Sequence, residues 1–116
     1  TYQFHVADGV LSGLLFQRSC DLGLGFGFNV FAASMLIRML AQQCGYEPGE
    51  LIWQGGDVHL YMNHGELVEE QLSRKPHGAP KLHLLRKPES IFAYEIEDFE
   101  VLDYQPQAHI AAPVAV

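Results

Sequence analysis

The residues best suited to chemistry lie between Gln17 and Asn29, in the stretch QRSCDLGLGFGFN. It combines an amide, a guanidinium, a hydroxyl and a carboxylate, carried by Gln17, Arg18, Ser19 and Asp21, and it closes on the amide of Asn29. Such groups are held on loops by a rigid scaffold when they bind a ligand. Solvated polar residues of a glycine-rich connection would give the same pattern. Local chemistry alone leaves both interpretations open.

Two regular elements flank this stretch and must position it. Residues 2–17 are predicted to form an antiparallel hairpin, because the Asp8-Gly9 pair suits a tight turn that needs positive φ. The second strand would then deliver Gln17 and Arg18 at its end. A helix is predicted over Asn29–Gln43, with Asn29 as the N-cap and Gly45 as the C-terminal stop. Because the helix is apolar nearly all round, we expect it to be buried in a larger body.

The remainder of the chain alternates short elements with turns. The double glycine at 55–56 predicts a tight bend, after which His59 and Tyr61 would lie on one side of an extended segment. The expected elements are a turn at 47–50, a strand at 51–53, a helix at 65–74, strands at 81–85, 91–96 and 99–102, and an irregular arm at 103–116.

Composition limits the classes of function. The 116 residues are 48% hydrophobic and 18% charged, which fits one globular domain, and no apolar run is long enough to cross a bilayer. The net charge of −7 argues against DNA binding and against anionic membranes. Two cysteines provide no disulfide framework, and we expect Cys44 to be a buried hydrophobe. The scattered histidines predict no metal site.

Four segments carry a family resemblance. In chain order they read QRSCDLGLGFGFN, WQGGDVHLYMNH, RKPES and APVAV. Together they resemble the C-terminal portion of thymidylate synthases, from the first residue to the last. The resemblance implies an α+β fold in which a mixed or antiparallel sheet is packed by a long buried helix. It also implies that residues 1–116 are the C-terminal part of a single domain, with 103–116 as the arm that closes the site.

The resemblance implies a reaction as well. This family methylates deoxyuridine monophosphate reductively to thymidine monophosphate, with methylenetetrahydrofolate supplying carbon and hydride. The nucleophilic cysteine of the family lies upstream of the strand that begins here at Tyr2, and neither Cys20 nor Cys44 is in its position. We therefore expect this chain to be inactive alone. The alternatives are a non-catalytic homologue or fragment that keeps a pyrimidine-nucleotide site, or a related deoxyuridylate hydroxymethylase.

Roles in nucleotide binding are implied residue by residue. Arg18 and Ser19 match the phosphate-binding pair. Asn29 matches the asparagine that donates to a uracil oxygen and accepts from the ring N–H, which favours uracil over cytosine. The full set implied to bind nucleotide is Gln17, Arg18, Ser19, Asp21, Asn29, His59 and Tyr61, of which His59 and Tyr61 hold the sugar hydroxyl.

The folate side is implied in the same way. Asp21 matches an acid at the nucleotide–folate junction, where a carboxylate can accept from pterin N–H groups. Asp21 and Asn29 are the residues implied to assist catalysis. The residues implied to bind folate are Asp21, Leu24, Gly25, Phe28, Val114, Ala115 and Val116.

The family also implies a cytoplasmic homodimer that uses no metal. Three departures from its pattern affect the stretch around the site. Gly27 stands where the family usually has proline, which predicts a more mobile loop. Gly23 replaces a usual aromatic residue, and Ala32 and Ala33 replace small polar and aromatic residues in the helix.

Overall fold

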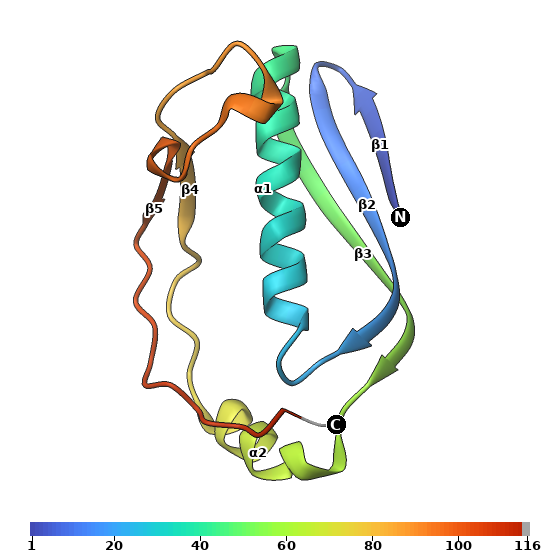
Figure 1. Ribbon diagram of the computed structural model, residues 1–116, viewed down its shortest axis with the longest axis vertical. Coiled ribbons are helices and arrows are strands. Elements are labelled where there is room, and N and C mark those ends of the chain that lie inside the picture. Colours follow the sequence, from blue (N-terminus) through green and yellow to red (C-terminus); the bar gives the residue numbers. More distant parts are fainter. Residues whose placement is uncertain (115–116) are drawn as a thin grey trace.

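A computed structural model describes residues 1–114 of the chain. Its main body is a three-stranded sheet with one long helix against it, and a smaller two-stranded sheet lies on the other side of that helix (Figure 1). This mixed architecture confirms the predicted α+β class. The helices and strands are β1 (Tyr2–Ala7), β2 (Val10–Asp21), α1 (Phe26–Cys44), β3 (Glu47–His59), α2 (Gly65–Ser73), β4 (Lys81–Leu84) and β5 (Phe99–Leu102).

The predicted hairpin is confirmed as the pair β1 and β2. Its turn uses Asp8 at φ 49° and Gly9 at φ 77°, the left-handed conformations that an Asp-Gly turn supplies. The strand β2 runs four residues past Gln17, the predicted end, and stops at Asp21. Residues 17–19 therefore lie within a strand, where neighbouring backbone hydrogen bonds hold them more firmly than a loop would.

The strands β2 and β3 run parallel, so the chain must cross over between them, and α1 makes that crossover. The predicted stop at Gly45 is confirmed, with φ 75° in the left-handed region. The predicted start was three residues late. Gly25 precedes the first helical residue, so Asn29 lies in the first turn and is not the N-cap.

The predicted turn at 47–50 and bend at Gly55-Gly56 are wrong, since both lie inside β3. The register runs from Val10 opposite Glu47 to Asp21 opposite His59. Pairing along the whole of β2 therefore overrides the local turn signals. Pro48 is tolerated because β3 is an edge strand that pairs on one side only.

The core forms where α1 crosses β2. Ala33, Ile37 and Ala41 of the helix are buried, and Ile37 and Ala41 pack with Leu11 of the strand. Away from this stripe, Phe28 in the first turn of α1 is 80% exposed within residues 1–114, and burial of the helix in a larger body stays a prediction. The prediction for the helix end fails, because Cys44 is exposed. Cys44 lies in the last helical turn, beyond the buried residues Ala33, Ile37 and Ala41.

A smaller unit is built from β4 and β5, which pair antiparallel. The strand predicted at 91–96 is wrong, because this segment contains the 3₁₀ turn Ile91–Ala93 and a second turn begins at Ile96. A bidentate ion pair fixes the second turn. Arg86 donates through Nε and Nη2 to the two carboxylate oxygens of Asp98, over 2.7 and 2.6 Å.

The C-terminal segment from residue 103 to 114 contains no helix or strand. It returns along α2 toward the end of β3 (Figure 1). Arg74 Nη1 donates to the carbonyl of Ala108 over 2.6 Å, and Gln107 Nε2 donates to the carbonyl of Lys75 over 2.7 Å. The structure thus places an irregular arm against α2. Throughout residues 1–114 no helix is long and apolar enough to cross a membrane.

The Arg86–Asp98 pair predicts a loss of stability in acid. Hydrogen bonds from Arg86 and from the Glu95 amide hold the pKa of Asp98 below its ordinary value. A carboxyl group with a lowered folded-state pKa stabilises the fold above its unfolded pKa, and that contribution is lost as pH falls through the folded pKa, from about pH 5 downward. Asp98→Asn should lower the urea midpoint of unfolding at neutral pH. The midpoint of this variant should also fall less than that of the parent as the pH is lowered. Glu97→Gln, at an exposed neighbour, is the control. Equal pH dependence in Asp98→Asn and the parent would contradict this role.

Candidate functional site

The polar residues of the site meet where β2 and β3 end and α1 begins. Parallel pairing sets Ser19 opposite Asp57 and Asp21 opposite His59, so both strands bring polar residues to one edge of the sheet. A tight turn then joins β2 to α1. Within it, the Gly23 amide donates to Asp21 Oδ1 over 2.9 Å, and the Gly25 amide donates to the Asp21 carbonyl over 3.0 Å. Asp21 therefore organises the turn with both its backbone and its side chain.

Gln17 is the centre of a hydrogen-bond network. Its Nε2 donates to Asn29 Oδ1 over 2.7 Å and to the carbonyl of Ser19 over 3.1 Å. Its Oε1 accepts from the indole Nε1 of Trp53 over 3.0 Å. The indole also packs edge-on against Phe26, at 5.1 Å between centroids. The network thus links β2, β3 and the first turn of α1 through one amide.

This network fixes the orientation of two amides. An indole N–H can only donate, so the Gln17 atom that faces Trp53 must be the oxygen. The Gln17 nitrogen then faces Asn29, and the Asn29 atom that meets it must be its oxygen. Within residues 1–114 the Asn29 NH₂ group has no acceptor, and its Oδ1 keeps one lone pair. It can therefore donate to a ligand carbonyl and accept from an adjacent N–H.

A hollow of about 250 Å³ lies beside this network. Gln17, Arg18 and Asn29 contribute to its lining, together with the chain start at Thr1. Arg18 is exposed, and no ion pair joins it to a carboxylate of residues 1–114. Its guanidinium is therefore available to an anionic ligand. Ser19 is not among the residues that line this hollow.

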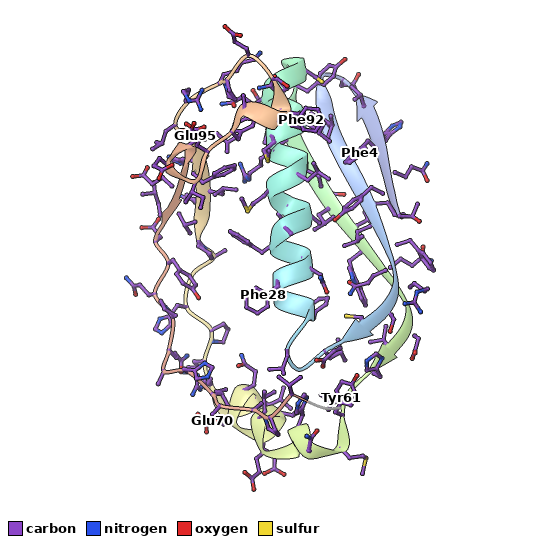
Figure 2. The ribbon with its side chains drawn as sticks, viewed as in Figure 1. Phe4, Phe28, Tyr61, Glu70, Phe92 and Glu95 are labelled. Carbon is purple, nitrogen blue, oxygen red and sulfur yellow. The ribbon has the colours of Figure 1, made fainter. Side chains whose placement is uncertain are left out.

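Three aromatic rings follow the end of β3. The ring of Tyr61 packs edge-on against His59 at 5.2 Å and against His64 at 5.6 Å between centroids. His59 Nδ1 lies 3.6 Å from Asp57 Oδ1. The structure therefore brings His59 and Tyr61 together, as predicted, and Tyr61 stays 40% exposed beside the arm (Figure 2).

The predicted folate-side residues are more dispersed. Leu24 and Gly25 lie in the turn after Asp21, and Leu24 is half-buried. Phe28 projects from α1 away from the main sheet (Figure 2), and Val114 is 77% exposed. Ala115 and Val116 lie outside the described residues. The two exposed side chains show apolar surface without packing partners, which is the condition for contact with a flat ligand ring.

Sequence reasoning missed two residues of this region. Trp53 fixes the Gln17 amide, and Gly55 makes room for it, since a Cβ on Gly55 would lie 2.4 Å from the indole. His64 is fully buried, and its Nε2 lies 2.8 Å from the carbonyl of Pro113 in the arm. Both belong to the quoted segment WQGGDVHLYMNH, but their partners are 36 and 49 residues away along the chain, so no local pattern reveals them.

The two cysteines are poorly placed for nucleophilic chemistry. Cys20 is 1% exposed, and burial raises the pKa of its thiol, with a further contribution from the Asp21 carboxylate. A raised pKa disfavours the reactive thiolate. Cys44 is exposed but lies in the last turn of α1, at the opposite end from Asn29. Across residues 1–114, no three His, Cys, Asp or Glu side chains gather closely enough to hold a metal ion.

The fold and the polar groups at the sheet edge indicate a class of small-molecule binding site. A mixed sheet with a crossover helix carries, at one edge, an oriented amide pair, an unpaired guanidinium and a carboxylate, which suits binding of a small polar anion with a hydrogen-bonding ring. Comparison with known proteins names the family. The model of the thymidylate synthase family matches residues 1–116, and the chain belongs to that family.

Individual relatives agree with this assignment. The chain is 68% identical to the thymidylate synthase of Sphingopyxis alaskensis over 117 residues, and 63% identical to those of Novosphingobium aromaticivorans and Rhizorhabdus wittichii over 116 residues. Each match covers 100% of this chain. The chain spans only 37–38% of the length of these relatives.

The Gln17 network predicts the effect of removing its indole donor. Trp53→Phe keeps a ring against Phe26 but leaves Gln17 Oε1 without its partner. We expect the free energy of unfolding to fall by about 1 kcal/mol, the usual contribution of one such hydrogen bond. Urea denaturation measures it. Tyr46→Phe, which removes a hydroxyl from an exposed ring, is the control. An unchanged midpoint for Trp53→Phe would show that the network does not stabilise the fold.

Proposed function

We propose that this chain supplies nucleotide- and folate-binding groups for a thymidylate synthase reaction, the reductive methylation of deoxyuridine monophosphate to thymidine monophosphate. Family membership supports the reaction class. The observation that carries the proposal for this chain is the amide orientation at Asn29, fixed by Gln17 beside a hollow that Arg18 also lines. The chain covers little more than a third of its relatives, so the reaction needs groups that these residues do not supply.

Asn29 is the proposed reader of the base. Its free NH₂ donates to a uracil carbonyl, and the remaining lone pair on Oδ1 accepts from the adjacent ring N–H. Cytosine presents the reverse arrangement, so it would place donor against donor and acceptor against acceptor. The Gln17 bond pre-sets this orientation, which lowers the entropy that Asn29 loses when the base binds.

Arg18 is the proposed phosphate ligand. Its planar guanidinium can donate two parallel hydrogen bonds to phosphate oxygens, and no carboxylate of residues 1–114 competes for it. The Ser19 hydroxyl would add a neutral donor to the phosphate, and Gln17 would position Asn29. His59 and Tyr61, already in ring contact, would hold the sugar hydroxyl.

The folate would bind on the Asp21 side. Asp21 Oδ1 accepts from the Gly23 amide, which leaves Oδ2 to accept from a pterin N–H, and the side chain is 23% exposed. When bound, methylenetetrahydrofolate supplies the one-carbon unit and the hydride. Leu24, Gly25 and Phe28 would line its ring. The arm, through Val114, Ala115 and Val116, would exclude water from the site.

The nucleophile would come from elsewhere. The buried thiol of Cys20 and the distant thiol of Cys44 are unsuited, so we assign that role to a cysteine on another segment or another chain. A cytoplasmic homodimer is part of the proposal. Support for a second copy comes from the sheet face opposite α1, where Phe16 is 40% and Ile52 is 52% exposed.

Activity in a chimera tests this function. The chain would replace its counterpart in the Sphingopyxis alaskensis thymidylate synthase, to which it is 68% identical. We expect the chimera to convert deoxyuridine monophosphate to thymidine monophosphate only when methylenetetrahydrofolate is present, followed by the absorbance of the dihydrofolate formed. The unmodified relative is the control. A folded chimera that binds deoxyuridine monophosphate without turnover would favour the non-catalytic alternative, and one that releases hydroxymethyl product would favour the hydroxymethylase.

Asn29→Asp tests the base assignment. An aspartate keeps the acceptor for Gln17 Nε2 but replaces the NH₂ donor, so the network survives while the reading of the base changes. Titration calorimetry of the chimera should show weaker deoxyuridylate binding by about tenfold and a gain for deoxycytidylate. Asn63→Asp, an exposed amide to acid change, is the control. An unchanged preference in Asn29→Asp would contradict the assignment.

A further inference from the structure

His64 is the most completely buried large side chain of residues 1–114, with 0% of its surface exposed. It ends the 3₁₀ turn Met62–His64, just before α2. Two segments that are distant in sequence and one neighbouring ring surround the imidazole. They are the arm at Pro113, the turn after β2 at Gly23, and Tyr61 beyond the end of β3.

The hydrogen bond to the arm determines the tautomer of the ring. The Pro113 carbonyl can only accept, so the nitrogen that lies 2.8 Å from it, Nε2, carries a hydrogen. In the neutral ring, Nδ1 then presents a lone pair. Among residues 1–114 this atom has no hydrogen-bond partner, although it is buried. Such a group costs free energy unless it is used, so its persistence points to a role.

The unpartnered nitrogen faces the Asp21 turn. Asp21 Oδ1 lies 4.0 Å from Nδ1, beyond hydrogen-bond distance. Gly23 lies closer to the ring. A Cβ added at Gly23 would lie 2.5 Å from Nδ1 and 3.2 Å from Cε1. The turn therefore packs against the imidazole edge closely enough to leave no room for a side chain at Gly23.

We propose that His64 is a positioning residue that couples the Asp21 turn to the C-terminal arm. One ring edge is in contact with the turn and the opposite nitrogen donates to Pro113, so the ring transmits the position of Asp21 to the arm. This coupling deepens the proposed function, on which its catalytic meaning rests. A ligand that forms a hydrogen bond with Asp21 would displace the turn. Through His64, this displacement would change how tightly the arm is held.

The arm offers an internal standard for the test. Ala111 and Ala112 lie next to Pro113, whereas Ala108 is held separately by the 2.6 Å bond from Arg74. Selective ¹⁵N-alanine labelling of the chimera gives a backbone order parameter at each position. Loss of the His64 bond should lower the values of Ala111 and Ala112 into the flexible range, below about 0.6, and leave Ala108 unchanged.

Two pairs of variants separate coupling from general destabilisation. His64→Ala removes the donor, and His64→Gln restores an N–H near the position of Nε2, so the second should rescue the arm. Gly23→Ala pushes on the ring without altering it, and should loosen Ala111 and Ala112 as His64→Ala does. Gly27→Ala is the matched control, because a Cβ there meets no described atom within 4 Å.

The outcomes are decisive without any turnover assay. Loosening of Ala111 and Ala112 in His64→Ala and Gly23→Ala, with rescue by His64→Gln and no change in Gly27→Ala, supports the coupling. If His64→Ala does not fold, the two glycine variants decide. Unchanged order parameters in Gly23→Ala, or equal loosening in Gly27→Ala, overturn it. A chimera that lacks synthase activity yet shows this pattern would refute the proposed function and retain the coupling.

Discussion

The parallel pairing of β2 with β3 is the constraint on which the rest of the structure depends. Parallel neighbours need a crossover, and α1 provides it, packing a narrow stripe of small and branched residues onto β2. The same pairing fixes the register in which Asp21 lies opposite His59. Because a short connection joins β2 to α1, the first helical turn of α1 lies next to the end of β2. Residues far apart in the sequence, such as Asp21 and His59, are thereby held at one edge of a sheet.

The site uses hydrogen bonds to orient its polar groups before any ligand is bound. Both ends of the Gln17 amide are bonded to protein partners, Trp53 and Asn29, so Gln17 is a positioning residue of this network. One carboxylate oxygen of Asp21 accepts from the Gly23 amide in the turn, and the other has no such bond within the described residues. Arg18 has no partner among the ion pairs of the described residues. Gln17 therefore positions a neighbouring side chain, whereas Arg18 and one oxygen of Asp21 are available to a ligand.

Much of this arrangement follows from sequence, and the failures have physical causes. The hairpin at Asp8-Gly9 and the helix stop at Gly45 were predictable because positive φ has a local residue signature. The length of β3 was not, since Pro48 and Gly55-Gly56 signal turns locally and only the partner strand overrides them. The motif residues of the site were found through family resemblance. Trp53 and His64 were not, because their roles depend on contacts with distant segments. The exposure of Cys44 and Phe28 reflects a packed stripe narrower than the apolar surface of α1.

Arg18 and Asn29 are proposed to bind the two ends of one nucleotide. The most direct measurement is a crystal structure of the chimera with deoxyuridine monophosphate. We expect the phosphate in hydrogen-bond contact with the Arg18 guanidinium and the uracil edge paired with the Asn29 amide, whose oxygen still accepts from Gln17. A nucleotide bound elsewhere, or one whose base turns away from Asn29, would contradict it.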